Sequence, residues 1–158
     1  MTVSPSLSCE AADVRKILVQ LLGRTLLVVE EARHWRDGVR GEGDEALIDF
    51  WLYFDGLPAV HVCGDDDGER LLVTFDEPYA SYDMGEYGEF RVASPRQTDL
   101  LWHYAGHQLV DAAVLGDRVG VLFRFDHRDL AVVERDDDFV LSDAAPAGLA
   151  VGDWLTTV

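Results

Sequence analysis

The stretch Ile48–Phe54, with the sequence IDFWLYF, decides the fold more than any other part of the chain. Every second residue in it is large and apolar, namely Ile48, Phe50, Leu52 and Phe54. Side chains on a β-strand point to opposite faces in turn, so this alternation predicts a strand with one face against a core. The stretch Val119–Phe125 alternates in the same way and predicts a second such strand.

These two strands belong to an internal repeat that runs through most of the chain. The segment 22–27 (LGRTLL) aligns with 105–110 (AGHQLV) at an offset of 83 residues, and 50–55 (FWLYFD) aligns with 121–126 (VLFRFD) at an offset of 71. The offsets differ because the first copy carries 12 extra residues around Trp35–Ala46. That stretch is rich in glycine and charge, which is typical of an extended loop. The matches keep their order, which favours a tandem duplication.

Each copy begins with a predicted helix. In the first copy the helix covers about Glu10–Leu22, because one apolar stripe at helical spacing is formed by Val14, Ile17, Leu18, Leu21 and Leu22. In the second copy the helix covers about Pro95–Ala105, with Ser94 as its N-cap and Gly106 at its end.

Four strands are predicted after each helix. The third and fourth strands of the first copy cover about Ala59–Cys63 and Arg70–Phe75, with a tight turn at Gly64–Gly68 between them. Their counterparts in the second copy cover about Leu130–Glu134 and Phe139–Ser142. The order of elements is therefore α-β-β-β-β, twice over.

We predict an α+β fold built from this tandem repeat: a mostly antiparallel sheet, one short helix per repeat, and two halves related by a pseudo-two-fold axis. Residues 1–158 form one compact domain, with repeats at about 9–78 and 94–146. An acidic, aromatic loop at 76–93 joins the repeats and contains a short strand at Glu89–Ala93. A chain of this length can bury a core of its own.

Charge narrows the classes of function. The chain has 13 Lys and Arg against 30 Asp and Glu, for a net charge of −17. Nucleic-acid binding is not expected, because phosphate backbones attract clustered cations. A net charge of this size raises the rate of encounter with a basic partner. The other interpretation is an acidic composition shared with the rest of the proteome.

The sequence also bears on compartment. The N-terminal residues carry no basic and apolar pattern of a signal peptide, and no apolar run approaches the length of a membrane span. Two cysteines, Cys9 and Cys63, without CxxC spacing fit a reducing compartment. We therefore expect a cytoplasmic protein. A duplicated domain can also form a homodimer.

No pattern of catalytic or metal-binding residues stands out. Asp65–Asp67 and Asp136–Asp138 lack the spacing of a calcium loop and suit solvated turns. His103 and His107 have the spacing of a helical metal pair, but Gly106 interrupts the helix between them. There is no GxSxG or Walker A motif, and carboxylates are too abundant to indicate glycosidase chemistry. We predict no catalytic residue, cofactor or metal site, and an enzyme is the less favoured class.

The candidate residues for partner binding fall into three groups. Trp51 and Tyr53 lie on the strand face opposite Phe50, which is either an open contact surface or a second core layer under a helix. The connecting loop, which either recognises a basic surface or only links the halves, contributes Tyr79, Tyr82, Asp83, Glu86 and Tyr87. The acidic turn, expected beside that loop, contributes Asp65, Asp66 and Asp67.

Four segments carry a resemblance to known proteins: Gly23–Leu26 with its counterpart Gly106–Leu109, Phe123–Asp126, Val132–Asp143 and Asp83–Gly88. They resemble small acidic uncharacterised bacterial proteins similar in type to the immunity proteins of toxin–immunity systems. The resemblance implies a non-enzymatic inhibitor of a basic partner such as a toxin, and it carries over no site residues. The alternative is a small-ligand binding protein or minor enzyme with a cleft between the two repeats.

Overall fold

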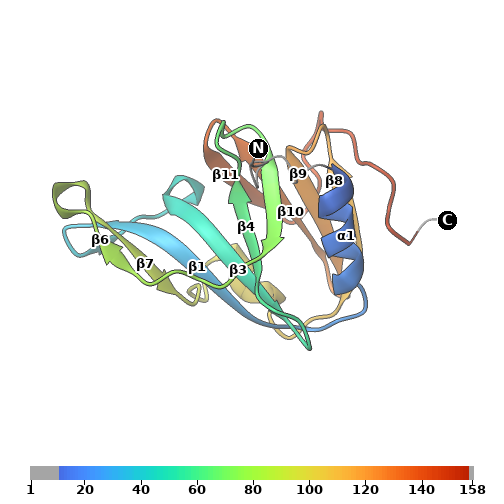
Figure 1. Cartoon of the computed structure of the whole chain (residues 1–158), viewed down its shortest axis with the longest axis horizontal. Coiled ribbons are helices and arrows are strands. Elements are labelled where there is room, and N and C mark those ends of the chain that lie inside the picture. The colour runs from blue at the N-terminus through green and yellow to red at the C-terminus, as the bar shows by residue number, and fades with distance from the viewer. Residues whose placement is uncertain (1–10, 157–158) are drawn as a thin grey trace, which may run out of the picture.

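Two antiparallel sheets and one α-helix form the described part of the chain, residues 11–156 of the computed structural model (Figure 1). The first sheet has the order β5-β4-β3-β1-β7-β6, with β2 paired to β1. The second sheet has the order β11-β10-β9-β8. The predicted α+β class with mostly antiparallel sheet is confirmed.

The strand boundaries follow the alternating apolar patterns closely. The strands of the first sheet are β1 (Leu26–Arg36), β2 (Val39–Arg40), β3 (Leu47–Phe54), β4 (Val60–Gly64), β5 (Leu71–Phe75), β6 (Tyr82–Asp83) and β7 (Glu89–Ala93). Those of the second sheet are β8 (Leu109–Leu115), β9 (Gly120–Phe125), β10 (Asp129–Arg135) and β11 (Asp138–Ser142). The short strand predicted at Glu89–Ala93 is confirmed as β7, which pairs with the long strand β1.

The main core lies between the two sheets. Phe50 of β3 packs edge-on against Phe139 of β11, with ring centroids 5.4 Å apart, so one face of each sheet meets the other. The helix α1 (Ala11–Leu21) packs against β5 and β8, one strand from each sheet, and lies beside β8 in Figure 1. Its predicted apolar stripe is confirmed, since Val14, Leu18 and Leu21 are buried in the core. Residues 9 and 10, at the predicted start of the first copy, lie outside the described residues.

The α-helix predicted at Pro95–Ala105 is wrong. Only a short 3-10 helix, η4 (Leu100–Tyr104), forms there. The Asp99 carboxylate accepts the backbone N–H of Arg96 at 2.6 Å and also binds the Arg40 guanidinium at 2.5 Å. A side chain that captures nearby backbone N–H groups competes with helix formation, so the segment turns before η4 begins.

The extended loop predicted around Trp35–Ala46 is only partly correct. β1 continues to Arg36, turns at Asp37-Gly38 and returns as β2 before the short 3-10 helix η2 (Asp44–Ala46). Both turn residues have positive φ, 52° and 74°, which is the geometry of a two-residue hairpin that favours Asp-Gly. Residues 35–40 therefore extend β1 and form β2 instead of an open loop.

A strained turn joins β10 to β11. Its two central residues, Asp136 and Asp137, have φ of 51° and 70°, while Arg135 pairs with Asp138. Asn-Gly is the preferred sequence for such a turn. We expect the double replacement Asp136→Asn/Asp137→Gly to raise the free energy of unfolding by about 1 kcal/mol, because it relieves left-handed backbone strain. Urea unfolding measures the change, and a loss of stability would contradict this account of the turn.

Candidate functional site

The two Asp-rich turns lie side by side, although they are 71 residues apart in the sequence. The backbone N–H of Asp137 donates to the carbonyl of Gly68 at 3.2 Å, and the Asp137 carboxylate lies against the Cα of Gly68. Asp65 is half-buried, and its carboxylate accepts the backbone N–H groups of Glu69 and Arg70. The carboxylates left exposed on the two turns are Asp66, Asp67, Asp136, Asp137 and Asp138.

A buried carboxylate lies beneath these turns. Glu134 is only 5% exposed, and its side chain lies against Gly64 at the end of β4. Burial, followed by the charges of Asp137, Asp138 and Asp65, raises the pKa of Glu134 to about 7. We call Glu134 and the turns 65–67 and 136–138 the acidic end.

The candidate residues Tyr82, Asp83, Glu86 and Tyr87 of the connecting loop are not beside the acidic end. Tyr82 and Asp83 form β6, which is separated from β4 by three strands of the first sheet, or by roughly 19 Å at ordinary strand spacing. The hairpin of β6 and β7 projects away from α1 in Figure 1. Asp83, Glu86 and Tyr87 are exposed there. The expectation that the 65–67 turn lies beside this loop is wrong, because the chain crosses the sheet between β5 and β6.

That crossing also covers Trp51, so its proposed role as an exposed contact is wrong. Trp51 has no exposed surface, and it lies under Tyr79 and stacks on His61 with ring centroids 4.9 Å apart. A loop provides this cover and not the helix considered for it. Tyr53 is half-buried, and burial, followed by its hydrogen bond with Glu30, raises its pKa to about 12.

A polar cluster lies beside Trp51 on the outer face of the first sheet. It brings together Asp49 of β3 with His61 and Cys63 of β4. The Asp49 carboxylate accepts the Tyr79 hydroxyl at 2.5 Å on one oxygen and contacts His61 Nε2 at 2.9 Å with the other. Both oxygens therefore have a partner, and the cluster fastens the crossing segment to the sheet.

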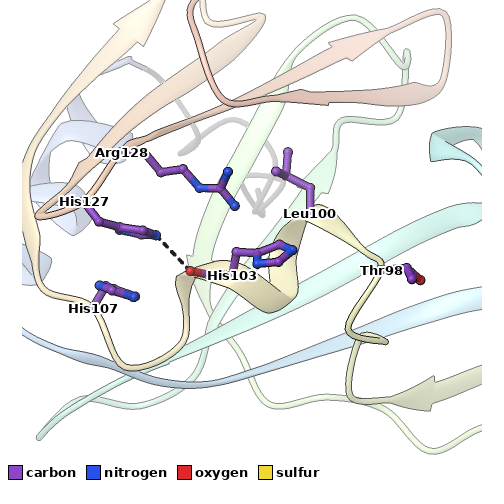
Figure 2. Close-up of a pocket in the computed structure, with 6 residues that line it drawn as sticks. All are labelled: Thr98, Leu100, His103, His107, His127 and Arg128. Carbon is purple, nitrogen blue, oxygen red and sulfur yellow. Dashed lines mark hydrogen bonds between the residues drawn. The ribbon is translucent and has the colours of Figure 1, made fainter.

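A second polar cluster lines an open pocket of about 600 Å³, which is formed by residues between Thr98 and Arg128 (Figure 2). The residues that line it are Thr98, Leu100, His103, His107, His127 and Arg128. Three of the chain's five histidines thus meet in one place. All of the lining residues come from 98–128.

The His107 and His127 rings are stacked in this pocket, with centroids 3.6 Å apart and planes at 12°. The Nδ1 atom of His107 lies 2.8 Å from Asp126 Oδ1, and that of His127 lies 3.6 Å from the same oxygen. His127 Nε2 contacts the main-chain carbonyl of His103 at 2.9 Å, drawn as a dashed line in Figure 2. Two ring nitrogens and one carboxylate oxygen thus converge on one point.

Electrostatics at this cluster favour a neutral His127. Burial holds the pKa of His127 below its ordinary value, although the hydrogen bond to the His103 carbonyl acts in the opposite direction. The backbone N–H of Gln108 and the His107 ring hold the pKa of Asp126 below its usual range. These shifts favour an ionised Asp126 carboxylate beside a neutral His127 ring.

The sequence pattern did not reveal this cluster, because the two histidines at helical spacing are His103 and His107. The pair that forms joins His107, just before β8, to His127, in the turn between β9 and β10. The available signal was the position of His107 just before one predicted strand and of His127 just after its antiparallel neighbour, because Leu109 of β8 pairs with Phe125 of β9. Antiparallel pairing brings the residues before one strand next to the residues after its neighbour, whatever their separation in the sequence.

Comparison of the chain with protein-family models, with curated proteins and with solved structures gave no match. None of the helices within residues 11–156 has the length and apolar character needed to cross a membrane.

Proposed function

We propose that this chain is a cytoplasmic, non-enzymatic binding protein of the immunity type, which inhibits a basic protein partner such as a toxin by binding it at the acidic end. The observation that carries the proposal is the contact between the two Asp-rich turns. Segments 65–70 and 134–138 together hold eight acidic residues and two arginines. Such a surface attracts a cationic partner over a longer range than single charges do.

The buried Glu134 adds a reason why a cation is favourable here. Burial makes it costly for the Glu134 carboxylate to ionise, and the surrounding aspartates add to this cost. A Lys or Arg side chain placed at the acidic end would offset both this cost and the repulsion among the surrounding aspartates. The acidic end is thus more favourable with a basic partner bound than without one.

Capture from extract of the native cell tests the proposal with two variants that lose the same charge. The acidic-end variant carries Asp66→Asn, Asp67→Asn, Asp136→Asn and Asp138→Asn, all at exposed positions. The matched control removes four exposed charges elsewhere, through Asp76→Asn, Glu77→Gln, Asp83→Asn and Glu86→Gln.

We expect the wild type and the control to retain one basic protein in equal amounts, and the acidic-end variant to lose it. High salt should release that protein, because the Debye length falls from about 10 Å at 0.1 M to about 3 Å at 1 M. Adding the chain to the purified partner should inhibit the partner's activity. Loss of the protein in the control variant but not in the acidic-end variant would place the contact within residues 76–86 and overturn the proposal. Capture of no basic protein by any variant would also overturn it.

We also propose that the two sheets arose by duplication and are related by a pseudo-two-fold axis. Thr25 and Gln108, which align at the offset of 83, form an isolated antiparallel bridge with each other. The hydrogen bonds around it are reciprocal: Gly23 donates to Leu109 at 2.8 Å, and Gly106 donates to Leu26 at 2.6 Å. Self-pairing of equivalent positions is what a two-fold axis through this bridge requires.

A further inference from the structure

We infer that His107, Asp126 and His127 bind a divalent transition metal ion of the zinc class. The observation behind the inference is that two imidazole Nδ1 atoms and one carboxylate oxygen lie within 4.8 Å of one another. Imidazole and carboxylate are suitable ligands for Zn²⁺, whereas Mg²⁺ and Ca²⁺ prefer oxygen alone. This site is separate from the acidic end and does not depend on the function proposed for it.

The hydrogen bond between His127 and His103 prepares His127 to be a ligand. A main-chain carbonyl only accepts, so His127 Nε2 carries the proton and donates it at 2.9 Å. In the neutral ring, Nδ1 then has a lone pair, and this is the atom that faces Asp126 and His107. Metal-bound histidines are commonly oriented by such a bond from the other ring nitrogen.

Without a cation, the contact between His127 Nδ1 and Asp126 Oδ1 brings a lone pair toward a carboxylate at 3.6 Å. A cation between His127 Nδ1 and Asp126 Oδ1 would be attracted to both atoms and would remove this repulsion. A metal ion held by all three groups would supply this positive charge.

The backbone holds the ligands in place. The second oxygen of Asp126 accepts the backbone N–H of Gln108 at 3.1 Å, and the backbone N–H of Asp126 donates to the Gln108 carbonyl at 2.9 Å. These bonds join the residue next to His107 to the residue next to His127. A ligand set fixed by strand ends needs little reorganisation to bind metal.

The other half of the molecule offers a contrast. Under the proposed duplication, Arg24, Asp55 and Gly56 take the places of His107, Asp126 and His127. There the Arg24 guanidinium donates to the Asp55 carbonyl at 2.8 Å, and no imidazole is present in these three positions. The permanently charged Arg24 thus lies near Asp55 in one copy, whereas the imidazole rings of His107 and His127 lie near Asp126 in the other.

Titration with Zn²⁺ in competition with a chromophoric chelator tests the inference, together with Co²⁺ absorption spectra and NMR of the histidine ring nitrogens. We expect one Zn²⁺ per chain at this site and movement of the Nδ1 resonances of His107 and His127 in the wild type. His107→Ala and His127→Ala should each weaken Zn²⁺ binding by about 100-fold. Removing a residue that only supports a ligand already weakens metal binding by up to about 100-fold, and these substitutions remove the ligand itself. Lower pH should also weaken binding, because protons compete for the ligands.

His103→Ala is the matched control, because it lines the same pocket but only its main-chain carbonyl takes part. It should leave Zn²⁺ affinity unchanged. The inference fails if Zn²⁺ binds wild type and both alanine variants equally, if the Nδ1 resonances do not move, or if no Zn²⁺ binds. It also fails if Cys63→Ser abolishes binding while His127→Ala does not, since the metal would then belong to the Asp49 cluster.

Discussion

Replacement of Glu31 by alanine is expected to lower the free energy of unfolding by about 3–5 kcal/mol, because it leaves two buried guanidinium groups without their shared partner. Glu31 is 3% exposed on β1. Its carboxylate accepts Arg33 Nε at 3.0 Å and an Arg40 guanidinium nitrogen at 2.9 Å, and both arginines are buried. The measurement is urea unfolding at neutral pH.

Glu42→Ala provides the matched control. Glu42 binds the same Arg40 guanidinium at 3.0 Å, but its side chain is 69% exposed. An exposed ion pair contributes about 0–1 kcal/mol, so this variant should remain close to the wild type. Equal losses in the two variants would mean that burial does not determine how much the Glu31 ion pairs contribute to the free energy of unfolding.

Glu134→Gln is expected to stabilise the fold above neutral pH, by about 3 kcal/mol at pH 8. The folded protein holds the Glu134 proton up to a pKa of about 7, whereas the unfolded chain releases it near the ordinary value of 4.5. Between these values the native state binds more protons, so the contribution of Glu134 to stability falls as pH rises. The glutamine amide keeps the shape of the side chain and does not ionise.

The pH dependence of the gain distinguishes this explanation from general charge removal. Below about pH 4 both states are protonated at this position, so the variant and the wild type should differ little. The difference should grow from pH 5 to pH 8 in urea unfolding. Glu69→Gln, which removes an exposed carboxylate near the same turn, is the control and should show no comparable growth. A gain that is the same at pH 4 and pH 8 would contradict a raised pKa at Glu134.

Local patterns predicted most strands because each pattern reports a local requirement. Alternation at Ile48–Phe54 and Val119–Phe125 predicted β3 and β9, and Glu89–Ala93 was predicted to the residue. The failure at Pro95–Ala105 has a tertiary cause. Asp99 turns toward Arg40, a residue 59 positions away, and no local window contains that partner.

The candidate sites depended still more on long-range contacts. The Asp-rich turns were identified from the sequence as separate features, but their contact depends on how the two sheets pack. Trp51 was recognised as a notable aromatic residue, yet the path of the chain over the sheet decided that it is buried under Tyr79. The meeting of His107 with His127 depends on the pairing of β8 with β9.

The sequence alone determined the charge, the strand faces and the turn positions of this protein, because these follow from composition and from the period of the apolar residues. The tertiary structure decided which turns meet, which aromatic residues are covered and which ring nitrogens converge. The physical reason is that such contacts join residues far apart in the chain. Their geometry is fixed by sheet pairing and packing of the shared core, which no local pattern encodes.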